Sequence, residues 1–287
     1  MQNYNKQISI ELYDENESVS SFIIECPVTG RKPKIEVQGV LLPNDEISSV
    51  EVRIVNFYST KPEPYKNIKV YAGYENTEAL CFSGKITNIY DENAAPEKVT
   101  VITSQVGNIY NNVNTIINIS MPANFKLYDA LLETKNKAGL KRNIIFDSAD
   151  LKEITSIAPW SFTGNLQTAL HELSGVFKSN VFFIYTNDTI KVMAKKGVLN
   201  EGNAIIINQL KSPLLLAGDT AIIKAPWNPT IKPGDVVYVS TLAYKSQGTI
   251  AAGTKREYYR VNSVEFKFNT VTGVNDMTLQ VYSEKEA

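Results

Sequence analysis

The sequence predicts a mainly β protein with a small α+β portion in its middle. Alternating apolar and polar residues recur at a spacing of about ten residues over the first hundred positions and return after residue 204. Fifteen Tyr and eleven Phe, beside one His and four Met, form a composition typical of strands. Helical periodicity is confined to the middle. We therefore expect two tube-type β-barrel domains, residues 1–120 and 201–287, that bracket a two-helix α+β domain, residues 121–200.

The N-terminal part contains short segments in which every second residue is apolar, the period of half-buried strands. Glycines interrupt two of these segments, Gly73 within Ala-Gly-Tyr and Gly84 between Phe82 and Ile86. An isolated glycine in a strand indicates a bulge, a bend or a close backbone approach, and barrels need such bends. The expected strands cover residues 8–12, 22–24, 35–37, 50–54, 68–72, 82–86 and 99–103.

The middle part carries two helical stripes. Residues 127–138 place apolar side chains on one face, with Asn124 as the expected cap and Gly139 as the expected stop. A second helix is expected over residues 163–174, with His171 on its polar side. Strands at 181–185 and 189–193 around Asn187-Asp188 predict a hairpin.

The C-terminal part is organised around residues 218–240, where Trp227 lies between Pro226 and Pro229. Prolines cannot occupy the interior of a hydrogen-bonded ladder, so these residues and Pro233 predict a stiff corner between strands at 220–225 and 235–240. Pro233-Gly234-Asp235 has turn chemistry. The remaining strands are expected at residues 205–207, 214–216, 258–268 and 277–281, the last two as a long hairpin.

Charge and cysteine content exclude several classes of protein. The chain is 21% charged with a net charge of −1, which disfavours a nucleic-acid binder of the basic-patch kind. Cys26 and Cys81 provide neither a disulfide framework nor a zinc motif, so both are expected to be reduced. The first thirty residues contain no basic apolar leader, and no apolar run approaches the roughly 18 residues of a membrane helix. We expect a protein made in a cytosol, without membrane insertion by this chain.

No residue pattern predicts catalysis, a cofactor or a metal. His171 is the sole imidazole, and no Ser, Cys or carboxylate motif accompanies it, so it is expected to be a solvated histidine. A glycosidase would need two carboxylates at a set separation, which the sequence does not define. Gly84-Lys85 lacks the other residues of a phosphate loop. The carboxylates considered, all expected to be solvated, are Asp129, Glu133, Asp147, Asp150 and Glu153.

Four segments, in order along the chain, resemble the tail hub proteins of bacteriophages and related contractile injection systems. They span residues 50–283, most of the chain, and the resemblance is carried by whole segments rather than by a constellation of reactive side chains. An appended lysozyme-like or peptidase-like portion is absent from the sequence. The segments are VEVRIVN, IKVYAGY and ALCFSGKI at 50–56, 68–74 and 79–86; the helices at 127–132 and 165–173; WNPTIKPG at 227–234; and YRVNSV at 259–264.

The resemblance implies a structural baseplate hub rather than an enzyme. Such a hub is a homotrimer whose six β-barrels join a six-fold tail tube to a three-fold spike. The barrels line a channel through which phage DNA passes without specific binding, and the middle domain contacts spike or other baseplate proteins. The protein is then a virion tail component that is assembled in the host bacterial cytoplasm. Residues expected to serve structure or interfaces are Gly73, Tyr74, Gly84, Trp227, Asn228, Pro229, Pro233 and Gly234.

Two other functions remain open from the sequence. One is a tail-associated hydrolase of cell wall or polysaccharide, which an acidic pair facing one cleft would support. The other is a free-standing β-rich binding protein without an assembly role. Within the resemblance, Trp227 is expected to be a packing or subunit-contact residue rather than a ligand platform, because Trp is enriched in cores and interfaces.

Overall fold

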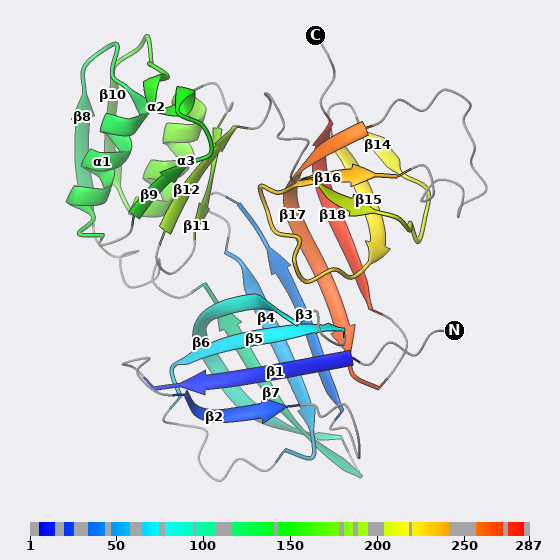
Figure 1. The fold of residues 1–287 in the computed structure, drawn as a ribbon. Coiled ribbons are helices and arrows are strands. Elements are labelled where there is room, and N and C mark those ends of the chain that lie inside the picture. The colour runs from blue at the N-terminus through cyan, green and yellow to red at the C-terminus, as the bar shows by residue number, and fades with distance from the viewer. Residues whose placement is uncertain are drawn as a thin grey trace.

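The protein is mainly β, and a computed structural model shows three groups of elements (Figure 1). Strands from both ends of the chain form one large sheet, and the middle of the chain forms a separate group of short helices and strands. No described helix is long and apolar enough to cross a membrane. The structure describes residues 6–14, 20–25, 34–43, 47–57, 65–74, 78–94, 96–106, 116–140, 143–177, 181–185, 189–194, 204–217, 220–240, 257–271 and 275–283.

The N-terminal β region is an antiparallel array with the order β3-β4-β7-β6-β5-β1-β2. Its strands show the predicted period of two: in β4, Val50, Val52 and Ile54 are buried while Glu51 and Arg53 are half-buried. The bounds are β1 (Lys6–Tyr13), β2 (Ser20–Glu25), β3 (Ile35–Leu41), β4 (Ser49–Val55), β5 (Asn67–Tyr74), β6 (Ala79–Ala94) and β7 (Glu97–Gln105).

The C-terminal β region continues the same sheet through β17. One edge of β17 pairs first with β16, where Arg260 opposes Val236, and then with β3, where Phe266 opposes Gly39. Its other edge pairs with β18, which in turn pairs with β15. The bounds are β13 (Ile205–Ile207), β14 (Leu215–Ala217), β15 (Thr220–Pro226), β16 (Val236–Val239), β17 (Glu257–Asn269) and β18 (Asp276–Ser283).

A single hydrophobic core lies beneath this large sheet. It combines residues such as Ile10 and Val52 from the N-terminal region with Ile223, Trp227 and Leu279 from the C-terminal region. We call the two regions together the large β region. Burial of a side chain of this size stabilises the fold by roughly 1.5–3 kcal/mol, so each end of the chain depends on the other for much of its core.

The middle unit, residues 116–194, has a core of its own. Strands β8 and β10 pair in a two-stranded sheet, and β11-β12-β9 form a three-stranded sheet against which the helices pack. The bounds are β8 (Ile117–Met121), α1 (Leu127–Lys137), β9 (Asn143–Phe146), α2 (Asp150–Glu153), β10 (Trp160–Gly164), α3 (Leu166–Val176), β11 (Val181–Tyr185) and β12 (Thr189–Ala194).

The helix ends correct two expectations. The cap of α1 is Lys126, without a side-chain cap bond, whereas Asn124 adopts a positive φ of 63° in the preceding turn. Gly139 ends the helix with φ 65°, as predicted. Helix α3 begins at Leu166 rather than 163, because Asn165 Oδ1 accepts the backbone N–H of Thr168 and so caps it. Residues 163 and 164 instead belong to β10, which the sequence did not predict.

The predicted mainly β fold with a small α+β portion is confirmed. In the described residues the large sheet follows an open path from β14 to β2, so closure into two barrels stays a prediction, as does the division at residues 120 and 200. The predicted hairpin of β11 and β12 is present, while its turn residues Asn187 and Asp188 lie outside the described residues, as does Cys26.

Candidate functional site

The Pro-Gly corner, residues 226–235, is built around a buried tryptophan. Trp227 is 3% exposed and stacks on Phe266 with ring centroids 5.5 Å apart, and it meets the edge of Phe268 at 4.4 Å. Its backbone N–H donates to the carbonyl of Asn275 at 3.1 Å. These contacts fix the corner to the β17–β18 hairpin. Within the single chain Trp227 is a packing residue, one of the two roles, packing or subunit contact, expected from the sequence.

Asn228 shapes the turn that follows. Its Oδ1 accepts the backbone N–H of Thr230 at 3.0 Å and the Thr230 hydroxyl at 2.7 Å, so the side chain closes an Asx turn. The backbone N–H of Ile231 donates to the Asn228 carbonyl at 3.3 Å. Pro229 is buried within this turn. The amide of Asn228 is therefore committed to holding the corner.

The second half of the corner turns at Gly234, whose φ of 89° favours glycine. Pro233 is buried beside it. Asp235 Oδ2 accepts the backbone N–H of Lys232 at 2.8 Å, and the N–H of Gly234 donates to Val261 at 2.7 Å. Burial raises the pKa of the Asp235 carboxyl above its ordinary value. This half of the corner packs against β17 and against the β11–β12 hairpin of the middle unit.

A hollow of about 490 Å³ lies beside the first half of the corner. Tyr74, at the end of β5, and Trp227 both line it, as do Asn228 and Pro229, so it brings together four of the residues expected to serve structure or interfaces. None of its lining residues is charged. The lining residues from β13 and the segment after it are Ile206, Ile207, Asn208 and Gln209.

The two glycines of the N-terminal region occupy positions with different demands. A Cβ on Gly84 would lie 2.3 Å from the carbonyl oxygen of Gln105, so β6 approaches β7 too closely for any side chain. The register of this strand pair shifts just beyond, between Ile86 and Asn88. Gly73 lies buried within β5 opposite Gln7, and β5 continues through it to Tyr74. The close backbone approach expected of a strand glycine is thus found at Gly84.

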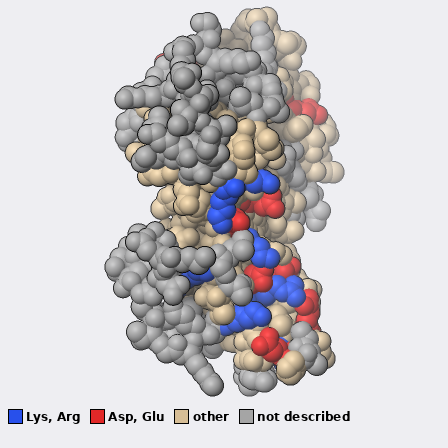
Figure 2. Space-filling view, turned by 90° about the vertical axis from the view of Figure 1, so that its right-hand side faces the viewer, with Lys and Arg blue, Asp and Glu red and all other residues tan. Residues whose placement is uncertain are grey.

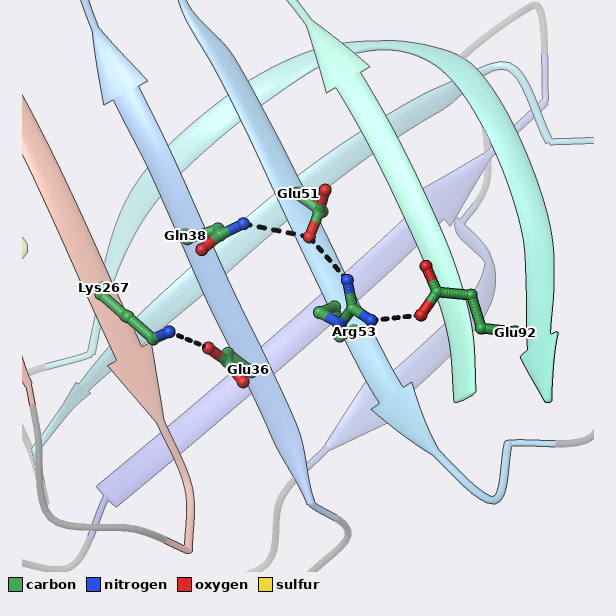
Figure 3. A network of polar contacts seen from close by, with 6 residues as sticks. All are labelled: Glu36, Gln38, Glu51, Arg53, Glu92 and Lys267. Carbon is green, nitrogen blue, oxygen red and sulfur yellow. Dashed lines mark hydrogen bonds and ion pairs between the residues drawn. The ribbon is translucent and has the colours of Figure 1, made fainter. Parts of the chain in front are cut away.

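The outer face of the large sheet carries charges that pair across strands (Figure 3). Arg53 Nη1 lies 3.2 Å from Glu51 Oε1, which also accepts Gln38 Nε2 at 3.0 Å. Arg53 Nη2 reaches Glu92 on β6, beyond β7, and Lys267 on β17 pairs with Glu36 on β3. We call this set the paired-charge face. The hydrogen bond that Arg53 donates to Glu51, more than any other contact, raises the pKa of the Arg53 guanidinium.

A shallow groove of about 690 Å³ crosses the paired-charge face where β17 meets β3. Its charged lining is Glu51, Glu265, Lys267 and Asp276, and Asp276 also pairs with Lys211. Figure 2 shows Lys and Arg side chains interspersed with Asp and Glu, without a large area of one sign. The described part of the surface in this view therefore carries charges of both signs.

The residues considered for catalysis are not brought into one cleft. His171 is exposed on α3, and Glu133 and Glu153 form surface pairs with Lys137 and Lys126 at 3.7 and 2.7 Å. Asp147 pairs with Arg260 at 3.2 Å. No described group of three or more His, Cys, Asp or Glu side chains could hold a metal ion. Cys81 is a free, buried thiol whose pKa burial raises to about 12.

The fold belongs to a class that phage tail proteins and a type VI secretion component share. The tail protein of Neisseria meningitidis MC58 superposes with a TM-score of 0.60, at 8% identity, over 98% of this chain and 97% of that chain. The 43 kDa tail protein of prophage MuSo2 from Shewanella oneidensis gives a TM-score of 0.56, at 8% identity, over 96% of both chains.

A third similar structure is the c3393 protein of E. coli, with a TM-score of 0.54 and 10% identity over 90% of this chain and 76% of that chain. It is a component of the type VI secretion system and exhibits structural similarity to the T4 bacteriophage tail proteins gp27 and gp5. No protein-family model and no curated protein matches the sequence. At these identities the likeness concerns the fold, and at that level the predicted resemblance to phage tail proteins is confirmed.

The sequence did not single out the paired-charge face. The sequence does contain a pattern that points to this face. The polar residues that alternate with the buried apolar ones are Glu36 and Gln38 in β3 and Glu51 and Arg53 in β4. Strand alternation places such residues on one face, but only the register of β17 against β3 brings Lys267 beside Glu36 and Gln38. The pairing of distant strands, which sequence periodicity does not encode, was the missing information.

Proposed function

We propose that this chain is a structural component of a phage tail or a phage-like injection machine, and that it forms the trimeric hub of the baseplate. The observation that carries the proposal is the fold itself, which follows two phage tail proteins over nearly their whole length. In this role the protein joins a six-fold tail tube to a three-fold spike and acts without catalysis. It is a part of the virion that is assembled in the bacterial cytoplasm.

The division of the large sheet supports a matching of symmetries. Each chain contributes an N-terminal and a C-terminal β region, joined edge to edge where β17 pairs with β3. Three chains around a three-fold axis would therefore present six β regions, which can meet a six-fold ring without breaking closed symmetry. The residues proposed to serve structure or interfaces remain Gly73, Tyr74, Gly84, Trp227, Asn228, Pro229, Pro233 and Gly234. All of them except Tyr74 and Asn228 are buried within the single chain, so we assign those six to the structure of the subunit.

The paired-charge face is suited to line the DNA channel. Binding to duplex DNA depends on Lys and Arg side chains that neutralise phosphates and release counterions. Here Arg53 is held between Glu51 and Glu92, and Lys267 is held by Glu36. Cations that are already paired gain little from a phosphate, so DNA would pass over this face without being retained.

The oligomeric state is the first test of the proposal. Light scattering of the purified protein should give three times the 32.0 kDa of the chain, and electron micrographs should show a three-fold ring with a central channel. A strict monomer at high concentration that binds neither tube nor spike protein would instead identify a free-standing β-rich protein. That result would overturn the hub.

The DNA-channel assignment has a separate test. Changing Glu36, Glu51 and Glu92 to Gln frees Lys267 and Arg53, and the triple variant should bind duplex DNA at low salt, whereas the wild type should not. A matched control changes Glu133, Glu153 and Glu172, all on the middle unit, to Gln. Equal DNA binding by the two triple variants would show that only net charge matters, and it would remove the argument for the paired-charge face.

A further inference from the structure

A buried arginine connects the large β region to the middle unit. Arg260 lies on β17, and its side chain is 4% exposed. Its Nη1 donates to Asp147 Oδ2 at 3.2 Å and to the carbonyl oxygen of Gly234 at 3.1 Å. Asp147 follows β9 in the middle unit, and its backbone N–H is anchored to Val192 at 2.9 Å. One guanidinium thus holds a carboxylate of the middle unit and the Pro-Gly corner of the large β region. We refer to these two units as the two bodies.

Other contacts between the middle unit and the large β region are apolar. Two side chains that lie opposite one another on β11 and β12, Phe182 and Met193, are buried but belong to neither hydrophobic core. Strand alternation turns them away from Val181 and Phe183, which face the helices. They therefore occupy the face of the three-stranded sheet that meets the corner.

Gly234 lies directly against the β11–β12 hairpin of the middle unit. A Cβ at this position would lie 2.6 Å from Ile184 Cδ1 and 3.0 Å from Met193 Cε. Its φ of 89° is also one that side-chain-bearing residues rarely adopt. The corner can thus rest directly on the β11–β12 hairpin because residue 234 has no side chain.

The Asp147–Arg260 ion pair is expected to add little stability to the fold, but it fixes the orientation of the groups that it joins. Arg260 Nε has no hydrogen-bond partner among the described atoms, and leaving a buried charged donor unpaired destabilises a fold. A planar guanidinium, however, fixes the direction of both groups that it binds. Two bodies with separate cores and a small contact are expected to move relative to one another unless something holds them.

We propose that the Asp147–Arg260 ion pair is a latch that sets the docked orientation of the middle unit, with Gly234 as its pivot. Breaking the pair frees the middle unit to change its orientation while both bodies stay folded. This inference concerns the single chain, and it stands or falls independently of the proposed hub assembly.

The latch is tested by a distance measurement between the bodies. Donor and acceptor dyes are placed at Glu172→Cys on α3 and Gln280→Cys on β18, both exposed positions, in a Cys26→Ser background. The native Cys81 is buried with a pKa raised to about 12, so it should escape labelling in the folded protein. Labelled chains are mixed with an excess of unlabelled protein, so that each pair reports on one subunit.

The wild type should show one narrow distance population, and Asp147→Asn and Arg260→Met should each broaden or shift it. The melting transitions of both bodies should persist in these variants. Glu153→Gln, which removes an exposed ion pair within the middle unit, serves as the control and should leave the distance unchanged. Distances identical to wild type in both latch variants would overturn the proposal, and so would loss of folding of either body together with the distance change.

The two partners should also differ in the effect of their removal. Asp147→Ala leaves the Arg260 charge buried and uncompensated, whereas Arg260→Met leaves Asp147, which is 33% exposed, free to be hydrated. Asp147→Ala should therefore lower the melting temperature more than Arg260→Met. The reverse order would mean that Arg260 serves as packing within the β region, and the latch would be rejected.

Discussion

The large β region and the middle unit use the chain in opposite ways. In the large region, Phe268 of β17 lies opposite Val37 of β3, so its core is completed only when both ends of the chain meet. The core of the middle unit comes from one continuous stretch, residues 117–192. The difference indicates that the two bodies should unfold separately. Each contains one of the two tryptophans, Trp227 or Trp160, and so carries its own reporter.

The largest effect is expected from Phe268→Ala in the large region. Phe268 is fully buried and contacts both Trp227 and Tyr74, so its truncation should destabilise this region by about 3–5 kcal/mol. Urea unfolding followed by Trp227 fluorescence in a Trp160→Phe background measures the change. The Trp160 transition, measured in a Trp227→Phe background, should keep its midpoint, and a common shift of both transitions would contradict the separation.

The reciprocal change is Leu170→Ala in α3. Leu170 is 1% exposed in the core of the middle unit, and its truncation should destabilise that unit by about 2–5 kcal/mol. Here the Trp160 transition should move to lower urea while the Trp227 transition stays in place. Leu132→Ala, at a position 36% exposed on α1, is the matched control with a small expected effect.

A smaller effect is expected where backbone rather than side chains limits packing. Gly84→Ala forces a methyl group against the Gln105 carbonyl of the neighbouring strand and should destabilise the large region by about 1–3 kcal/mol. Gly175→Ala, whose Cβ would meet no atom within 4 Å apart from its chain neighbours and the nearby backbone of its own helix, provides the control in the middle unit. Both are read from urea midpoints, and an unchanged Trp227 midpoint in Gly84→Ala would show that the strands can separate without loss.

The smallest effect concerns pH at the corner between the bodies. Burial raises the pKa of Asp235 in the folded protein above the ordinary value of 3.8. The protonated carboxyl therefore contributes its full stability to the fold below pH 3.8, and this contribution is lost as pH rises through the pKa of the folded state. Asp235→Asn keeps an oxygen for the Lys232 N–H and removes this loss. Its stability relative to wild type should increase from about pH 3 to about pH 7.

The sequence predicted the elements of the fold better than their partners. Alternation located β4 and the hairpin of β17 and β18, because burial on one face leaves a local pattern. It missed β8 and β10, two strands of five residues each that are separated in sequence by α1, β9 and α2, and it missed the capping role of Asn165. The conformation of Asn124 depends on the turn before α1, and its own propensity could not indicate that.

The candidate site was predicted in part. Trp227 and Pro233 were singled out because Pro and Gly mark the corner locally in the sequence. Tyr74 was also singled out, but only the structure shows that it lines the same hollow as Trp227. Arg260 was noted only within a segment of resemblance. Its buried contact with Asp147 joins residues 113 positions apart, a separation at which a single sequence carries no pairing signal.

The pairing of β3 with β17 also determines the order in which the protein can be completed. The backbone N–H of Ile35 binds the hydroxyl of Thr270, a partner 235 positions later in the chain. During synthesis, the edge of β3 would therefore stay open until β17 has left the ribosome, whereas the middle unit could already be folded. An open strand edge invites pairing with other chains, and such long-range contacts form slowly. Newly made protein should pass through an aggregation-prone stage that ends when β17 arrives.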